Sequence, residues 1–338
     1  MRWLITGGCG FIGRNLIREL LDSGETAIRV VDNFSVGTRE DLARICPLQS
    51  TPHERIVALQ EPGRPTVQLI EGDIVDEQLA LQASAGVDAI VHLAAETVVP
   101  ASVENPRKDC HVNILGTLNY LEAARHNGIK RFVFASSAAP IGNCEPPVHE
   151  DLAPRPISPY GASKLAGEAY CSVYYHTFGI ETVALRFSNV FGPASSHKSS
   201  VVASFIRSAL NGDTLHIFGN GLQTRDFIYV HDLVRAIQLA ASVDGIGGEV
   251  FQVATNTETT LNDLAQTLVG ILADRGIDGI GIVHDSERKG DVKRSFLDIT
   301  KARFRLGWTP QTSLFKGLHE TLDWFLQNNG IRSRLAAL

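Results

Sequence analysis

Leu4-Ile5-Thr6-Gly7-Gly8-Cys9-Gly10-Phe11-Ile12-Gly13, at the start of the chain, is the stretch that decides the fold. A short apolar strand here ends in glycines, which allow a tight turn and a close approach of the backbone to a pyrophosphate. A helix then begins, so its first N–H groups and its dipole face that anion. The spacing is GxxGxxG, and glycine-rich turns of this kind also occur as packing devices. The acid Asp32, which follows a second apolar strand about 20 residues later, favours a dinucleotide site.

Asp32 also indicates which dinucleotide binds. Its carboxylate can accept hydrogen bonds from ribose hydroxyls and would repel a 2′-phosphate. Arg29 and Arg39 are near it in the sequence, but they flank the acid rather than replace it. The sequence therefore predicts NAD as the cofactor, in preference to NADP.

Length and composition restrict the class of protein. The chain has 338 residues, which suits a nucleotide-binding domain with a smaller lobe attached. A formal net charge of -6 argues against a nucleic-acid partner, because such proteins usually concentrate positive charge on one face. The five cysteines contain no C-x-x-C pair, so they predict reduced thiols, with no metal site and no disulfide framework. We find no secretory signal and no apolar run that could cross a membrane, so the expected location is the cytoplasm.

Short apolar runs alternate with longer helical patterns along the first part of the chain. The runs that predict strands span residues 3–5, 28–31, 67–70, 89–91, 131–134 and 182–185. This alternation is typical of an α/β fold with a Rossmann-type, doubly wound parallel sheet. Residues 43–66 contain prolines at 47, 52, 62 and 65, which predict a surface excursion.

The pattern loosens after about residue 189, which predicts a smaller α/β lobe that closes over a substrate. No clean linker separates the two parts, so we predict an interleaved division. The NAD-binding domain comprises residues 1–188 and a returning segment near 225–260. The substrate lobe comprises residues 189–224 and 261–338.

Tyr160-Gly161-Ala162-Ser163-Lys164 is the second informative stretch. On a helix, a spacing of four places the tyrosine and the lysine on one face. An ammonium and a positive nicotinamide ring there would lower the pKa of the phenol from about 10 toward the working pH, making it a general base. The alternative is that the tyrosine and the lysine lie on a solvated helix face and have no catalytic role. The preceding strand ends in Ser136-Ser137, and this context favours a catalytic role.

The chain resembles the extended short-chain dehydrogenase/reductase family, in particular its NAD-dependent nucleotide-sugar epimerase/dehydratase branch, and is most similar to the UDP-hexose 4-epimerases. The resemblance covers nearly the whole chain. It rests on an ordered series of motifs: the glycine turn, Asp32-Asn33, Gly72-Asp73-Ile74, His92-Leu93-Ala94-Ala95, Asn113-Ile114-Leu115-Gly116-Thr117, Ser136-Ser137, the Tyr160/Lys164 pair, Arg186-Phe187-Ser188-Asn189-Val190-Phe191-Gly192-Pro193 and Arg225-Asp226-Phe227-Ile228-Tyr229-Val230-His231-Asp232.

This resemblance implies the residues that bind NAD and the residues that catalyse the reaction. The catalytic group is Ser137, Tyr160 and Lys164, with Ser137 bonded to the reacting sugar oxygen. The implied NAD contacts are Gly7, Gly10, Phe11, Ile12, Gly13, Asp32, Asn33, Ser35, Gly37, Thr38, Asp73, Ile74, Leu93, Ala94, Ala95, Asn113, Tyr160, Lys164 and Phe187.

The residues after Ser137 point to one reaction within the branch. The family's dehydratases have an Asp-Glu pair there and its decarboxylases a nearby Glu, because those eliminations need further acid–base groups. This chain has Ala138-Ala139-Pro140, so the resemblance implies a 4-epimerase, in which hydride is removed from sugar C4 and returned to the other face. The usual Val-Tyr-Gly is replaced by Pro140-Ile141-Gly142, which predicts a different pocket wall.

The resemblance also implies the contacts of a nucleotide sugar, with UDP favoured and thymidine or guanosine carriers left open. The forked N–H groups of an arginine guanidinium suit phosphate oxygens. For each arginine, the alternative to phosphate binding is a salt bridge at the surface. The diphosphate ligands are Asn189, Arg225 and Arg288; Asp291 would accept a ribose hydroxyl, and His216 and Phe218 lie in the segment beside the nucleobase. The remaining substrate contacts are Glu96, Ser137, Val201, Val202 and Ser295.

Several alternatives concern the sugar and the function itself. A small Ser295 would leave room for an N-acetyl group, Lys198 could meet the carboxylate of a hexuronic acid, and Glu96 could bind sugar hydroxyls or repel such an acid. UDP-glucuronate 4-epimerase, another dehydratase or reductase of this fold, and a non-catalytic NAD-binding sensor or scaffold therefore stay open. By resemblance we expect a homodimer, paired through a four-helix bundle, with a place in carbohydrate metabolism and polysaccharide biosynthesis.

Overall fold

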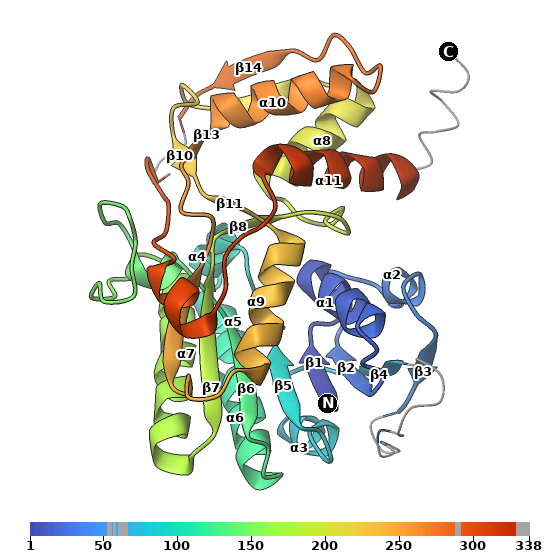
Figure 1. The fold of residues 1–338 in the computed structure, drawn as a ribbon, viewed down its shortest axis with the longest axis vertical. Helices are drawn as coiled ribbons and strands as arrows, with labels where there is room; N and C mark the ends of the chain where they lie inside the picture. Colours follow the sequence, from blue (N-terminus) through green and yellow to red (C-terminus); the bar gives the residue numbers. More distant parts are fainter. Residues whose placement is uncertain (53–55, 57–58, 60–66, 288–291, 329–338) are drawn as a thin grey trace.

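Eight parallel strands form the central sheet of the computed structural model, which describes residues 1–52, 56, 59, 67–287 and 292–328 (Figure 1). Their order is β12-β7-β6-β5-β1-β2-β4-β3. From β4 to β7 this is the doubly wound Rossmann order, which reverses between β1 and β5, so the predicted fold class is confirmed. The strands are β1 (Trp3–Thr6), β2 (Ile28–Asp32), β3 (Leu48–Ser50), β4 (Val67–Glu71), β5 (Ala89–His92), β6 (Arg131–Ser137), β7 (Glu181–Phe187) and β12 (Glu249–Val253).

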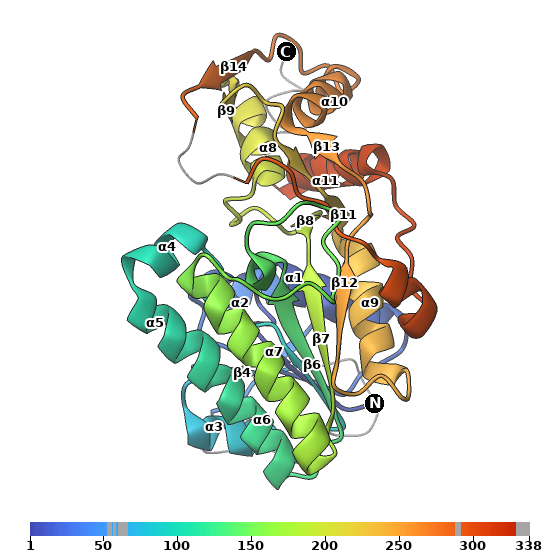
Figure 2. The ribbon, with the colours of Figure 1, turned by 90° about the vertical axis from the view of Figure 1, so that its left-hand side faces the viewer.

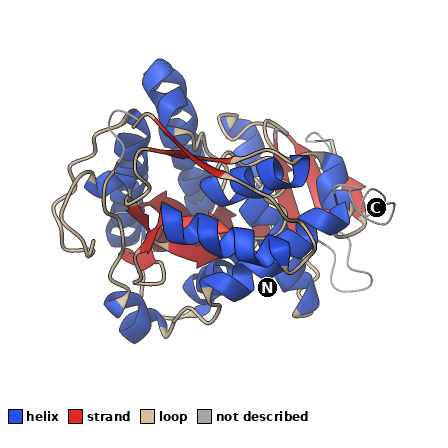
Figure 3. Cartoon of the chain, turned by 90° about the horizontal axis from the view of Figure 1, so that it is seen from above, coloured by secondary structure: helices blue, strands red, loops and turns tan. Residues whose placement is uncertain are grey.

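Helices cover both faces of this sheet, which explains why β1 and β2 are apolar along most of their length and fully buried. On one face lie α1 and α9, and on the other lie α3, α6 and α7 (Figure 2). Seen from above, the strands lie between helices (Figure 3). The helical segments of this lobe are α1 (Phe11–Asp22), α2 (Arg39–Ala43), α3 (Glu77–Ala83), α4 (Val99–Glu104), α5 (Pro106–Cys110), the π-helical η2 (His111–Leu115), α6 (Gly116–His126), the 3-10 turn η3 (Ala139–Ile141), α7 (Pro159–Phe178), α9 (Val230–Ser242) and the π-helical η4 (Ala302–Leu306).

The smaller lobe lies at the carboxyl ends of the strands and has its own apolar core (Figure 1). Two-stranded sheets β8–β11 and β9–β14 are parallel, and β10–β13 is antiparallel. The elements are β8 (Asn189–Phe191), α8 (Val201–Asn211), β9 (Leu215–Phe218), β10 (Thr224–Arg225), β11 (Phe227–Tyr229), β13 (Thr259–Thr260), α10 (Leu261–Ala273), β14 (Ile282–Asp285) and α11 (Leu314–Asn328).

The edge strand β3 lies within the segment predicted as a surface excursion, so that prediction is wrong for Leu48–Ser50. Leu48 pairs with Val67, and the strand follows Pro47 directly. Its three residues contain one apolar side chain, which is too short a run to show a strand period. The prolines at 62 and 65 lie outside the described residues.

The chain crosses between the lobes several times. β12 and α9, both in the predicted returning segment, belong to the large sheet and its helical layer. Residues beyond 261, which the predicted division gives to the substrate lobe, also return: Leu297 forms a bridge with Val148, and Trp308 is buried in the larger core, where its Nε1 donates to the Asp232 oxygen at 2.8 Å.

Among the described residues, no helix has the length and apolar character that a bilayer span requires. In the same part of the chain, His, Cys, Asp and Glu side chains form no group of three or more that could hold a metal ion.

Candidate active site

A cavity of about 680 Å³ lies where the two lobes meet, at the carboxyl ends of the parallel strands. This size and place are typical of ligand sites in doubly wound folds. Most of the predicted site residues line it: Gly7, Gly10, Phe11, Ile12, Gly13, Asp32, Asn33, Ser35, Gly37, Asp73, Ile74, Leu93, Ala94, Ala95, Glu96, Ser137, Tyr160, Lys164, Phe187, Asn189, Val201, Val202, His216, Phe218 and Arg225.

The glycine turn after β1 is packed so closely that it leaves no room for side chains. A Cβ on Gly13 would lie 2.5 Å from the Gly7 oxygen, and one on Gly37 would lie 1.9 Å from the Cys9 oxygen. The loop that carries Gly37 therefore lies directly against the turn. Helix α1 begins at Phe11 without a side-chain cap, and its first residues line the cavity. This open helix start fits the pyrophosphate of NAD.

Asp32 ends β2 at the cavity wall and is mostly buried. Its two carboxylate oxygens accept hydrogen bonds from the backbone N–H groups of Cys9 and Phe34, both at 2.8 Å. Burial raises the pKa of this carboxyl, and the two backbone bonds act in the opposite direction. Arg29 is buried in the sheet and Arg39 points elsewhere, so neither lines the cavity. An acid held in this way fits the ribose hydroxyls of NAD.

Ser137, Tyr160 and Lys164 meet at the cavity wall. Ser137 ends β6, whereas Tyr160 and Lys164 lie one turn apart on α7, which Ser158 caps. The Ser137 hydroxyl favours the ionised form of the Tyr160 phenol and so acts to lower its pKa. The Lys164 Nζ donates to the Ala135 oxygen at 2.8 Å and lies 5.9 Å from the centroid of the Tyr160 ring. The strand end and the helix thus place a hydroxyl, a phenol and an amine at one point of the cavity.

Burial dominates the pKa values of these groups. It raises the pKa of Tyr160 to about 12, while the Ser137 hydroxyl acts in the opposite direction. It lowers the pKa of Lys164 to about 8, against the carboxylates of Asp109 and Glu168. Burial therefore outweighs the groups that favour the phenolate, and the lowering of the phenol pKa by the Lys164 ammonium stays a prediction. The contribution of a positive nicotinamide ring stays a prediction.

Side chains of the smaller lobe close the other end of the cavity. The Arg225 Nη1 donates to the oxygens of Thr224 at 2.7 Å and Val292 at 2.6 Å. The His216 Nδ1 lies 2.9 Å from an oxygen of Asp285, which fixes the ring on the strand pair β9–β14. A guanidinium held by two carbonyls suits the recognition of phosphate oxygens.

Three predicted residues do not line the cavity. Thr38 caps α2 and accepts the Asp41 N–H at 3.1 Å. Asn113 is buried behind the wall, where its side-chain oxygen accepts the Glu96 N–H at 2.8 Å. Ser295 lies on a loop outside the cavity. Two further predicted residues, Arg288 and Asp291, lie outside the described part of the chain.

Sequence reasoning missed several residues of the cavity wall. The Lys108 Nζ lies 2.6 Å from the Glu96 carboxylate, and both residues line the cavity. Only its place five residues before Asn113, on the same helical stretch, could have indicated Lys108. Further residues of the wall that were not predicted belong to no motif that carries chemistry by itself, among them Thr97, Ser204, Phe205, Gln223 and Leu261.

A buried ion pair lies directly below the catalytic group. Glu168 follows Lys164 by one turn on α7 and accepts two hydrogen bonds from the Arg186 guanidinium, at 2.8 and 2.7 Å. Its carboxylate also accepts the hydroxyl of Ser136, the neighbour of Ser137. This carboxylate therefore joins the catalytic helix to β6 and β7.

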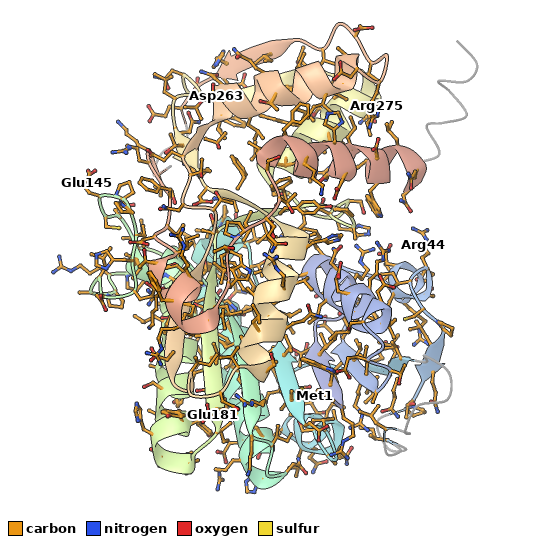
Figure 4. All side chains as sticks on the ribbon, in the orientation of Figure 1. Met1, Arg44, Glu145, Glu181, Asp263 and Arg275 are labelled. Carbon is orange, nitrogen blue, oxygen red and sulfur yellow. The ribbon has the colours of Figure 1, made fainter. Side chains whose placement is uncertain are left out.

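Replacement of Glu168 by Ala should lower the free energy of unfolding by about 3–5 kcal/mol, because it leaves the Arg186 guanidinium buried without its partner. Urea unfolding measures the difference. As a control, Asp323→Ala removes an exposed pair with Arg275, whose side chains are 41% and 34% exposed, and should cost about 1 kcal/mol or less (Figure 4). Equal losses in the two variants would contradict the assigned role of Glu168.

The doubly wound sheet, the glycine turn and the Ser-Tyr-Lys group together define a dinucleotide-dependent enzyme of the short-chain dehydrogenase/reductase type. The chain belongs to the NAD dependent epimerase/dehydratase family, whose model matches residues 3–254. The predicted family and the predicted NAD cofactor are thereby confirmed.

Individual relatives cover nearly the whole chain. The UDP-glucose 4-epimerase of Mycolicibacterium smegmatis is 35% identical over 334 residues, which are 96% of this chain and 98% of that protein. A crystal structure of UDP-glucose 4-epimerase with UDP-glucose from Thermotoga maritima is 36% identical, with a TM-score of 0.84 and coverage of 97% of this chain and 100% of that one. The dTDP-glucose 4,6-dehydratase of Streptomyces niveus is 32% identical over 335 residues, which are 97% of this chain and 94% of that protein.

Proposed function

We propose that this protein is an NAD-dependent UDP-sugar 4-epimerase. The single observation that carries the proposal is the composition of the catalytic group. It contains Ser137, Tyr160 and Lys164, and the two residues after Ser137 are alanines, where a dehydratase needs carboxylates. This is the activity predicted from the sequence, and the UDP-glucose 4-epimerases among the relatives bear it out.

Other carboxylates of the cavity do not supply the acid that an elimination needs. Among the described lining residues, the carboxylates are Asp32, Asp73 and Glu96. Asp32 and Asp73 lie with Asn33 on the side where the adenosine of NAD is expected, and Asn33 donates to Asp73 at 2.9 Å. Glu96 is already paired with Lys108. Family membership alone covers both reactions, so it is these positions that favour the epimerase over the dehydratase.

The catalytic residues then have distinct roles at the sugar C4 hydroxyl. NAD, when bound, supplies the acceptor and later the donor of the C4 hydride. The Tyr160 oxygen takes the proton of the hydroxyl and returns it after the keto sugar has turned, while the Ser137 hydroxyl holds the same oxygen. Lys164, mostly protonated at pH 7 with a pKa of about 8, places a positive charge near the phenolate.

The smaller lobe supports a nucleoside diphosphate as the part of the substrate that does not react. Arg225 and Asn189 offer a guanidinium and an amide for the phosphates, and His216 and Phe218 lie where the base would stack. Ser295, on which the N-acetyl alternative rested, does not line the cavity, whereas Lys198 does. The sugar therefore stays open between hexose, N-acetylhexosamine and hexuronate.

We further propose a homodimer in the cytoplasm. Helices α5, α6 and α7 lie side by side at the outer face of the larger lobe (Figure 2), and Leu115, Val173 and Phe178 are exposed apolar residues on this group of helices. Such a face suits pairing with a second copy. The described cysteines are free thiols, which supports a reducing compartment and, with the nucleotide-sugar substrate, a role in carbohydrate metabolism such as polysaccharide biosynthesis.

The activity is tested by incubating the purified protein, without added NAD, with UDP-glucose, UDP-N-acetylglucosamine and UDP-glucuronate. Proton NMR reports the configuration at C4. We expect inversion of one of these sugars at C4, which also names the substrate. A 4-keto-6-deoxy product would indicate a dehydratase instead, and absence of any change with NAD bound would contradict the proposal for UDP-sugars.

A further inference from the structure

The loop of residues 192–200, between β8 and α8, is attached to the larger lobe rather than free. The Arg14 Nη2 on α1 donates to the Ala194 oxygen at 2.6 Å, and the Asn15 Nδ2 donates to the Pro193 oxygen at 3.0 Å. Ala194 has a positive φ of 67°, which is unusual for a residue with a side chain. Contacts of this kind hold the loop in a conformation that it would not favour by itself.

Asp41, on α2, connects this loop with the larger lobe from a second side. One carboxylate oxygen lies 3.2 Å from the Arg14 Nη1, and the other lies 3.0 Å from the His197 Nε2. The Asp41 side chain is only 9% exposed, although Arg44, labelled in Figure 4, lies 3.7 Å from it at the surface. Burial raises the pKa of Asp41, but Arg14, Thr38 and His197 together lower it by more than burial raises it. The net shift is downward, so the carboxylate is charged at neutral pH.

The same carboxylate is bonded to Thr38, which follows the loop that borders the cofactor end of the cavity. Asp41 and Thr38 form a reciprocal capping box, with the Thr38 N–H on the carboxylate at 3.2 Å. Thr38 directly follows Gly37, which packs against the glycine turn. Movement of Asp41 would therefore disturb the loop of residues 33–37, which lines the cavity.

On the substrate side, the residues next to His197 also line the cavity. Lys198, Ser199 and Ser200 contribute to its wall, and the Lys198 Nζ lies 6.0 Å from the centroid of the Phe11 ring, at the start of α1. The two loops thus close over the same space from opposite lobes, and His197 with Asp41 joins them across 156 residues of sequence.

We infer that Arg14, Asp41 and His197 form a latch between the lobes, which positions the loop of residues 192–200 over NAD and slows the release of the cofactor. The inference rests on the proposed function in one respect, that an epimerase regenerates its cofactor in every turnover and gains from retaining it. Arg14 anchors the latch from within the larger lobe, and His197 closes it from the smaller one. His197 is a positioning residue, since it acts through the loop and does not line the cavity.

The experiment is a stopped-flow measurement of NADH release from the full chain, with excess NAD as the competitor and no sugar present. His197→Ala should speed release about two- to fivefold, the range expected for a partly exposed pair. His197→Gln, whose amide nitrogen can take the place of Nε2, should restore slow release. A purely structural effect of the substitution would not be rescued in this way.

The matched control is His149→Ala. The His149 side chain is 43% exposed and lies 4.0 Å from Asp151, whereas that of His197 is 45% exposed, but His149 does not line the cavity or join the lobes. Release from the control should equal that of the unchanged protein. Unchanged release in His197→Ala, or an equal increase in His149→Ala, would overturn the latch. The release experiment uses no sugar, so it tests the latch even if the protein inverts no UDP-sugar.

Discussion

Tyr160→Phe should reduce the rate of C4 inversion by about 10²- to 10⁴-fold, the range for the loss of a general acid–base group. The substitution removes only the hydroxyl that exchanges a proton with the sugar. The ring stays buried on α7, and the cavity wall near the nicotinamide keeps its shape. NAD content should therefore be unchanged. The rate is measured by proton NMR and the bound cofactor by absorbance after denaturation.

Tyr170→Phe is the matched control for this variant. Tyr170 lies on the same helix but does not line the cavity. Its loss of a hydroxyl should leave the rate of inversion unchanged. Full activity in Tyr160→Phe would remove the phenol from the mechanism, whereas loss of bound NAD in that variant would mean that the hydroxyl serves cofactor binding instead.

Gly37→Ala should weaken NAD binding by about 10- to 100-fold, the equivalent of an overpacked contact of about 1–3 kcal/mol. The added Cβ would lie 1.9 Å from the Cys9 oxygen and 2.4 Å from the Cys9 carbonyl carbon. Both are backbone atoms of the glycine turn, so they cannot rotate away. The loop and the turn must separate, which displaces the groups that face the pyrophosphate and the ribose.

A fluorescence titration with NADH measures the affinity of this variant. Gly270→Ala provides the control, because a Cβ at Gly270 meets nothing within 4 Å and the residue lies inside helix α10, in the smaller lobe. Its affinity for NADH should be that of the unchanged protein. Equal affinity in Gly37→Ala would show that the contact between loop and turn is not needed to hold the cofactor.

Local patterns were sufficient to predict the large sheet and most of the cavity wall. The strands β1 and β2 are apolar along most of their length because both faces of the sheet are covered, and the glycine turn carries its geometry in its own sequence. Tyr160 and Lys164 share a helix face because of their spacing alone.

The features that sequence reasoning missed depend on contacts between distant segments. The pKa of Tyr160 follows from burial, which no local pattern reports. Lys108 reaches the cavity through its pairing with Glu96, and His197 meets Asp41 from the other lobe. The edge strand β3 exists only because β4 lies beside it. Each depends on the packing of the folded chain rather than on the sequence around it.

The position of β12 late in the sequence limits how this protein can be divided into fragments. Strand β12 pairs with β7 along Val183–Phe187. It begins more than 60 residues after the end of β7, and β8, α8, β9, β10 and β11 of the smaller lobe lie between the two strands in the sequence. A fragment that ends near residue 188 would leave the N–H and C=O groups of β7 without partners on that side, and a bare strand edge of this kind promotes aggregation. We expect the isolated N-terminal segment to be insoluble, so a working module must be taken from the protein with both of its lobes.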